Sequence, residues 1–179
     1  YVITNTVITK INYKYLPDIV KMLINLDVDQ FQLAFVHPIG NAWKYFNLVV
    51  PRKTDTAPYI MKALDIAIEV GYKPGEVMVE AFPPCMMPGY EAFCSEFYIP
   101  EAEVMDFEQK IPKFENWRKN EGKLKFEQCK LCKFRNVCEG PWREYVWKYG
   151  EGEFKPVEGK AVNSLDEIMN NYKKGKRIP

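Results

Sequence analysis

The chain has 179 residues, of which 47% are hydrophobic and 15% aromatic, so it holds enough apolar side chains for one sizeable core, or for a core and a small appendage. Its 25 Lys and Arg residues nearly balance its 24 Asp and Glu residues, so no overall field would gather nucleic acid or an anionic membrane. No apolar stretch approaches the roughly 18 to 20 residues that span a bilayer, and no secretory signal opens the chain. These properties argue against disorder, nucleic-acid binding and membrane insertion, and they favour a soluble cytoplasmic protein.

The first part of the chain carries an alternating strand and helix pattern. Residues 1–10 are rich in β-branched side chains, which favours a buried strand. Apolar residues then recur at helical spacing over residues 16–26, with Pro17 in the first turn, where a missing N–H costs nothing. A second apolar run at residues 31–36 predicts another strand, and residues 37–41 close it with a loop sequence.

The pattern then repeats once more. Thr56 and Pro58 are typical of an N-cap and a first-turn proline, and they predict a second helix that stops at Gly71. Residues 77–82 predict a third strand. The order β-α-β-α-β implies right-handed crossovers and a parallel sheet. We therefore interpret residues 1–84 as α/β, a partial parallel β/α barrel that amounts to about half of a TIM-like barrel.

The pattern changes after residue 84, where prolines punctuate short pieces. We expect a loop- and helix-rich cysteine region over residues 85–150, with short helices at residues 114–121 and 141–149. Residues 151–179 are expected to be a C-terminal tail, with a capping-box pattern at Ser164 that begins a short last helix.

The cysteines carry the strongest chemical signal. The chain has five of them and no export signal, so metal or redox chemistry is favoured over disulfides. Cys129, Cys132 and Cys138 lie within ten residues, and the C-x2-C spacing lets one tight turn direct two thiolates at a single metal centre. Four thiolates complete such a centre, so a fourth must come from Cys85 or Cys94. We favour Cys85, because the prolines around it stiffen the backbone, whereas Cys94 resembles a buried apolar residue.

The spacing leaves the nature of the centre open. Four thiolates suit a [4Fe-4S] cluster and a tetrahedral zinc ion equally well. A dithiol redox pair of Cys129 and Cys132 is a weaker interpretation, because Cys138 and its loop fit metal ligation better.

Three stretches resemble the C-terminal part of a radical SAM enzyme. Residues 5–16 are similar to a late strand and helix of the radical SAM barrel, and residues 35–41 are similar to the next strand with its loop. Cys129, Cys132 and Cys138, followed by Glu139-Gly140 and preceded by Cys85, are similar to the auxiliary [4Fe-4S] region of the SPASM and twitch group. The cysteines are too few for two clusters, which favours a single-cluster, twitch-like extension.

The resemblance implies an iron–sulfur oxidoreductase that acts on a peptide or a small molecule. However, the chain lacks the C-x3-C-x2-C loop that binds the SAM-cleaving cluster, so it would be inactive alone. Together with the absence of an initiator Met before Tyr1, this predicts part of a longer chain or one half of a split enzyme. S-adenosylmethionine is then expected only when the missing N-terminal half is present. That half, or a second copy of the chain, is expected to cover the open sheet edge.

Candidate ligand-binding residues lie on the strands and at their ends. The resemblance makes Asn5, His37 and Asn41 candidates for contacts with S-adenosylmethionine or substrate, although His37 is also typical of a satisfied structural histidine and Asn41 of a simple turn. Glu80 places a carboxylate on a strand. It either points into the barrel, where it would need a partner or a substrate, or points outward and forms an ordinary salt bridge. No catalytic residue is identified. The alternative function is a structural zinc-binding module, held by the same cysteines as the cluster, that binds partners without catalysis.

Overall fold

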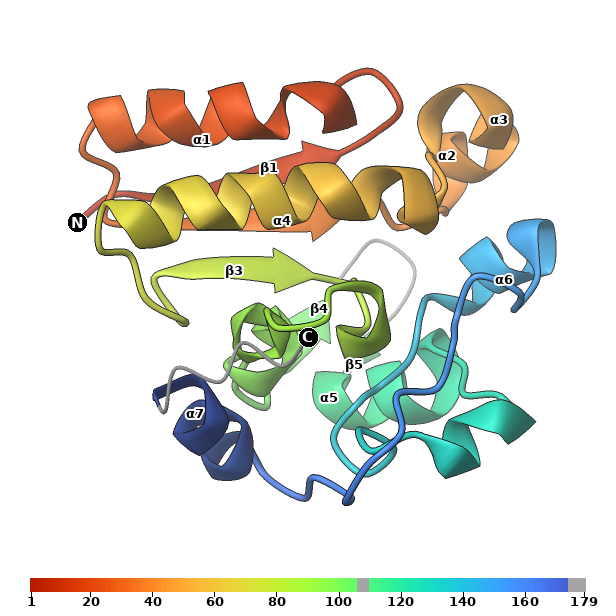
Figure 1. The fold of residues 1–179 in the computed structure, drawn as a ribbon. Helices are drawn as coiled ribbons and strands as arrows, with labels where there is room; N and C mark the ends of the chain where they lie inside the picture. Colours follow the sequence, from red (N-terminus) through yellow and green to blue (C-terminus); the bar gives the residue numbers. More distant parts are fainter. Residues whose placement is uncertain (106–109, 174–179) are drawn as a thin grey trace.

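A three-stranded parallel sheet forms the frame of the protein, whose computed structural model describes residues 1–105 and 110–173 (Figure 1). The strands lie side by side in the order β1 (Ile3–Ile8), β2 (Gln30–Phe35) and β3 (Val77–Glu80). All are parallel, with Ile3 opposite Gln30 and Phe31 opposite Val77. The predicted α/β class and parallel sheet are therefore confirmed. The sheet does not close on itself, so the half barrel stays a prediction.

Two helices cover one face of this sheet. α1 (Leu16–Asn25) and α4 (Lys53–Glu69) pack against each other and against the strands, as Figure 1 shows above the sheet. The side chains of Phe31, Leu33 and Phe35 alternate toward the helices, and all three are buried. The opposite face is mixed: Asn5 lies beside Gln32, and Val7 lies beside Ala34. One side of the sheet therefore packs into an apolar core, and the other carries both polar and apolar side chains.

The predicted start of the second helix is wrong. α4 begins at Lys53, with Arg52 as its N-cap, so Pro58 lies inside the helix. The side chain of Thr56 does not cap the helix, because its hydroxyl donates to the carbonyl oxygen of Arg52, 2.8 Å away. Packing of the apolar helix face extends the helix backward past the residues that resembled a cap. The predicted stop is correct, since Gly71 follows the helix end with a φ of 102°.

Two short helices occupy the segment that was expected to be a loop. α2 (Gly40–Lys44) begins at Gly40, whose φ is 53°, and α3 (Phe46–Val49) follows it. Such short helices depend on tertiary packing, and here Phe46 is buried against the rings of Trp43 and Tyr149.

The rest of the chain lies beyond the β3 edge of the sheet, where Cys94 forms a parallel bridge with Val79 (Figure 1). It is built from short turns and helices that are tied to the main core through Trp142, Tyr145 and Phe154. The elements are the 3-10 turns η2 (Pro84–Met86), η3 (Glu91–Phe93), η4 (Ser95–Phe97) and η6 (Glu127–Leu131), the antiparallel pair β4 (Val104–Met105) and β5 (Lys110–Ile111), the helices α5 (Phe114–Trp117), α6 (Arg143–Tyr149) and α7 (Leu165–Lys173), and the π-helical turn η5 (Arg118–Gly122).

Most predicted helices in this part are found, with shifted bounds. The helix predicted at residues 114–121 is α-helical only to Trp117 and then widens into the π-helical turn. The capping pattern at Ser164 is confirmed, because the backbone N–H of Glu167 donates to the Ser164 hydroxyl, 3.3 Å away. The predicted tail continues through residues 174–179, which lie outside the described residues. No helix in the described ranges is long and apolar enough to cross a membrane.

Candidate metal centre

Four of the five cysteines line one cavity. Cys85 lies in η2, just after β3, and Cys129, Cys132 and Cys138 come from η6 and the loop behind it. The remaining lining consists of apolar and cationic side chains and one glycine, namely Lys125, Phe134, Arg135, Gly140, Phe154, Lys155 and Pro156. Folding therefore brings a cysteine from the sheet half next to three cysteines more than forty residues later in the chain.

Backbone N–H groups point at the sulfur atoms. The N–H of Phe126 donates to Sγ of Cys129 at 3.4 Å, that of Gly140 to Sγ of Cys138 at 3.3 Å, and that of Val157 to Sγ of Cys132 at 3.4 Å. The backbone of Cys85 itself lowers the pKa of its thiol, against the larger effect of burial. N–H donors stabilise thiolates and tune metal centres, so the three sulfurs of the cysteine loop have surroundings suited to metal ligands.

The tight turn after Cys138 depends on glycine. Gly140 has a φ of 88°, and a Cβ atom there would stand 1.9 Å from the carbonyl oxygen of Leu124. Only a residue without a side chain permits this close approach of two backbones. The Glu139-Gly140 pair that follows the last cysteine therefore has a physical purpose: the glycine brings its own N–H to the Cys138 sulfur.

Burial of the cavity opposes ionisation of its thiols, whereas the cationic side chains that line it favour ionisation. Burial raises the pKa of Cys85, and the neighbouring sulfurs of Cys138, Cys132 and Cys129 raise it further. Burial also raises the pKa of Cys138 to about 12. The cationic lining acts in the opposite direction, and the described residues contribute no carboxylate to it. A bound cation deprotonates thiols that are neutral in its absence, and four cysteines without a carboxylate are a donor set of the kind that soft metal centres use.

The thiols share a cavity without a preformed ligand geometry. In the described part of the chain, no group of three or more His, Cys, Asp or Glu side chains is arranged so that it could hold a metal ion. All five cysteines are free thiols. Binding a metal at this cavity therefore requires the cysteine side chains to move toward a common centre.

Cys94 does not line this cavity, although it lines a smaller neighbouring one together with Cys138. Its side chain is buried in the main core, and its sulfur lies 3.7 Å from the carbonyl oxygen of Phe82. Burial is the main reason that its pKa is raised well above the usual value. This placement favours Cys85 over Cys94 as the fourth cysteine.

A buried ionic network joins the cysteine loop to the sheet. The Glu139 carboxylate accepts two hydrogen bonds from Arg118, both 3.0 Å long, and one of 2.8 Å from Lys123. Lys123 also contacts Glu96 at 2.6 Å, and Glu96 accepts the N–H of Ala81 just past β3. Although burial raises the pKa of Glu139, the two cations outweigh it and hold the pKa below its usual range. No periodicity indicated this network, because its members are far apart in sequence.

The three predicted ligand-contact residues occupy different surroundings. Asn5 is exposed on the open face of β1, and Asn41 is exposed in α2. His37 is partly buried and stacks on Trp142, with ring centroids 3.8 Å apart, while its Nε2 lies 3.2 Å from Oε2 of Glu144. Burial lowers the pKa of His37, and Glu144 counteracts only part of that effect. His37 therefore has the partners of a structural histidine, on the same side of the sheet as the cysteine region.

Glu80 faces away from the covering helices. It shares this open face with Ala34, its neighbour in register, and its carboxylate accepts a hydrogen bond from the Gln32 side chain. Burial raises the pKa of Glu80, and the charge of Glu96 raises it further. The carboxylate therefore faces away from the helices, which is the side predicted for the barrel interior, and it does not take the outward orientation.

The chain was also compared with protein-family models, with curated proteins and with solved structures, and none of them matched. Function must therefore be argued from the cavity and its surroundings.

Proposed function

We propose that this chain is the C-terminal portion of a radical SAM iron–sulfur oxidoreductase, in which Cys85, Cys129, Cys132 and Cys138 hold an auxiliary [4Fe-4S] cluster. The observation that carries the proposal is the meeting of these four cysteines in one cavity near the carboxyl end of a parallel sheet. Active sites of β/α folds lie at that end. A cluster there would support substrate binding or electron transfer.

The protein residues would serve the cluster in three ways. The three backbone donors orient and stabilise the thiolates of Cys129, Cys132 and Cys138. The cations of the lining offset the negative charge that four thiolates leave on the centre. The ionic network around Glu139 holds the loop against β3, so that the cluster keeps a fixed position relative to the sheet.

The first strand supports an incomplete barrel. Within the described residues β1 pairs only with β2, so its other edge has no strand beside it. Ile3 and Val7 are also exposed, with 62% and 50% of their surface accessible, on the same face of the strand as Asn5. An unpaired strand edge beside an exposed apolar face could be covered by another strand, which would come from a missing N-terminal half with the SAM-cleaving loop or from a second copy of the chain.

A structural zinc module is the second candidate. Cys132 packs into a small hydrophobic cluster with Phe134, Val162 and Ile168. A zinc ion held there would stabilise the cysteine loop, which has little regular secondary structure, in its packing against α7. In this case the chain would bind partners and carry no redox chemistry.

Metal analysis separates the two candidates. The protein is purified anaerobically, and its iron, sulfide and zinc contents are measured together with the visible spectrum. About four irons and four sulfides per chain with a broad brown absorption support the auxiliary cluster. About one zinc per chain without colour supports the structural module instead.

Cysteine variants identify the ligands in the same experiment. Cys138→Ala should lose the metal, whereas the matched control Cys94→Ala should keep it, because Cys94 lies in the main core outside the cavity. Failure of the wild-type protein to retain iron or zinc, even after reconstitution, would contradict both candidates.

A further inference from the structure

Lys53 is a fully buried lysine at the start of α4. Its side chain has 0% exposure, and its ammonium group donates to the carbonyl oxygen of Ala81 at 2.6 Å. Three aromatic rings surround it: its Nζ lies 3.3 Å from the ring centroid of Phe35, 4.9 Å from that of Phe82 and 5.0 Å from that of Tyr145. The rings and one carbonyl stabilise a cation, but they supply no negative charge.

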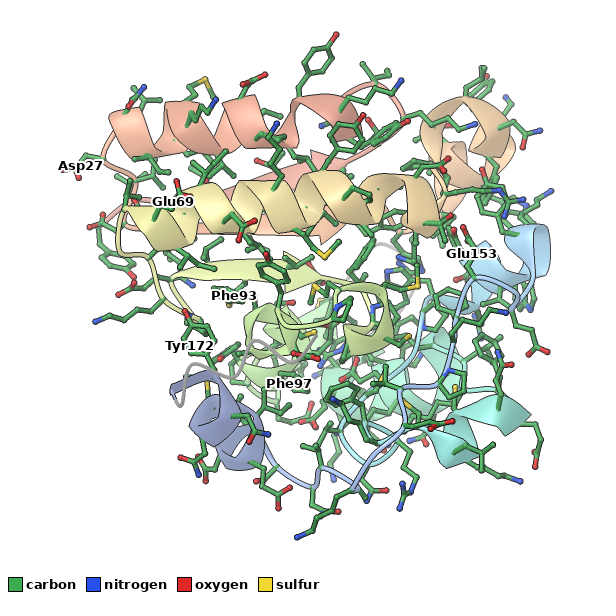
Figure 2. The ribbon with its side chains drawn as sticks, in the orientation of Figure 1. Asp27, Glu69, Phe93, Phe97, Glu153 and Tyr172 are labelled. Atoms are coloured by element: carbon green, nitrogen blue, oxygen red, sulfur yellow. The ribbon has the colours of Figure 1, made fainter. Side chains whose placement is uncertain are left out.

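The carboxylates nearest to Lys53 are engaged elsewhere. Glu96 pairs with Lys123, which also pairs with Glu139. Glu153 accepts hydrogen bonds from Tyr145 and Thr54 and lies 3.8 Å from Arg52, beside the N-terminal end of α4 (Figure 2). Within the described part of the chain Lys53 forms no salt bridge. A buried charge without a counter-ion is costly, so its presence needs an explanation.

Two other buried cations near the cavity are matched by carboxylates. Arg118 and Lys123 pair with Glu96 and Glu139. Glu80, which also faces this network, has a pKa raised by burial, which favours its neutral form. Among the described residues, Lys53 and Lys133 are the buried lysines without a salt bridge, and of the two Lys53 has no exposed surface.

Lys53 lies close to the cysteine cavity. Its neighbour Tyr145 contacts Phe154, with ring centroids 6.1 Å apart, and Phe154 lines the cavity. From the other side, α4 packs against η2, the turn that contains Cys85. Ala81, whose carbonyl Lys53 binds, precedes Cys85 by four residues and has a left-handed φ of 55° that turns the chain there.

We propose that Lys53 is the buried counter-cation of the four-cysteine metal centre. The inference rests on the proposed metal site. A zinc ion or an oxidised [4Fe-4S] cluster with four thiolates carries a net charge of about −2. The lysines and the arginine of the cavity lining are exposed, and water screens their charge, whereas Lys53 acts through the protein interior.

The electrostatics of Lys53 agree with this assignment. Burial lowers its pKa well below the usual value and Lys123 lowers it further, while Glu96, Glu153 and Cys85 oppose the shift. An added negative charge at the cysteines would strengthen that opposition. Metal binding and the charged form of Lys53 therefore stabilise each other, and Lys53 acts on the metal centre by electrostatic attraction and not by contact.

The test compares metal affinity with metal-free stability. Lys53→Met removes the charge and keeps the chain length, and Lys62→Met, which changes an exposed lysine on the same helix, is the control. The affinity for Zn²⁺ alone is measured by competition with a chromophoric chelator. Because Lys53 would attract the negative centre through the protein interior, we expect Lys53→Met to bind Zn²⁺ at least about tenfold more weakly than wild type, and the control to bind like wild type.

The metal-free proteins should show the opposite effect. Without metal the buried ammonium has no counter-ion, so Lys53→Met should unfold at a higher temperature than wild type. Unchanged Zn²⁺ affinity in Lys53→Met would overturn the proposal. A weaker affinity together with a lower metal-free unfolding temperature would also overturn it, because that pattern indicates general damage to the fold.

Misfolding of Lys53→Met and lack of Zn²⁺ binding by the wild type are separate cases. If Lys53→Met does not fold, Lys53→Gln takes its place, and the same pair of measurements decides. If wild-type protein binds no Zn²⁺, the proposed metal site has failed, and Lys53 is not the cause, which separates the two proposals.

Discussion

The two parts of the molecule hold their side chains in place by different means. Up to residue 84, regular strands and helices bury a periodic apolar face, with Leu33 and Ile60 among the fully buried residues. From residue 85 onward, the described elements are 3-10, π and α helices of at most nine residues and the two-residue strands β4 and β5. Buried ion pairs, a glycine with positive φ and backbone N–H groups on sulfur fix this second part. The stability of the first part depends mainly on the apolar area that it buries, and that of the second part depends more on individual polar and backbone contacts.

This difference predicts how each part responds to mutation and to metal. Loss of a core side chain should weaken the whole protein without altering the metal centre. Loss of a single polar or backbone contact in the second part should change stability and metal affinity together.

The largest effect is expected for Gly140→Ala. The new Cβ would clash with the Leu124 carbonyl at 1.9 Å and would strain a φ of 88°. We expect a loss of about 5 kcal/mol in the free energy of unfolding, measured by denaturant titration, and a weaker metal centre. Gly150→Ala is the matched control, because Gly150 also has a positive φ but open space around it, and about 1 kcal/mol is expected there. Equal losses at both glycines would show that the close approach at Leu124 does not matter.

Glu139→Gln should follow. It leaves Arg118 and Lys123 buried with less negative charge, at an expected cost of about 4 kcal/mol in unfolding free energy. Because the folded-state pKa of Glu139 is held below its usual value, its contribution is present at neutral pH and is lost as the pH falls through that folded pKa. The acid side of the stability profile should therefore flatten in Glu139→Gln. Glu127→Gln, at an exposed pair with Lys130, is the control and should change stability by less than about 1 kcal/mol.

Leu33→Ala probes the first part. Leu33 is fully buried under the helices, so we expect a loss of about 3 kcal/mol in unfolding free energy. Zn²⁺ affinity at a temperature where the variant is folded should equal that of wild type. A marked fall in affinity would mean that the sheet and the cysteine cavity are energetically coupled, against the contrast drawn above.

The smallest effect concerns Glu80→Gln. The pKa of Glu80 is raised by burial, so ionisation costs stability as the pH rises from the unfolded-state pKa through the folded-state pKa. Glu80→Gln should remove that cost, giving a slightly higher Tm than wild type at pH 7 and no advantage below pH 4, close to the ordinary value of a glutamate. A lower Tm at pH 7 would indicate that the charged form is needed, for example to hold Gln32.

Local pattern explains what could be predicted from the amino-acid order. β-branched and apolar periodicity indicated the three strands and the helices between them, and Gly71 marked the end of α4 correctly. The start of α4 was wrong because the residues around Thr56 resemble a cap, while burial of the preceding turn against Tyr145 decides the outcome. Helix ends and short helices such as α2 depend on packing partners that local pattern does not contain.

The sequence by itself determined the β-α-β-α-β order, the parallel sheet that follows from it, and a metal-type spacing in Cys129, Cys132 and Cys138, because each of these depends on residues that are near one another in the chain. Only the tertiary structure decided that Cys85 shares their cavity while Cys94 does not, and that Glu139 meets Arg118 and Lys123 in the interior. It also showed that Lys53 has no ion-pair partner among residues 1–105 and 110–173. Electrostatic and thiol contacts act across space between segments far apart in sequence, so no periodicity or spacing reveals them before the chain is folded.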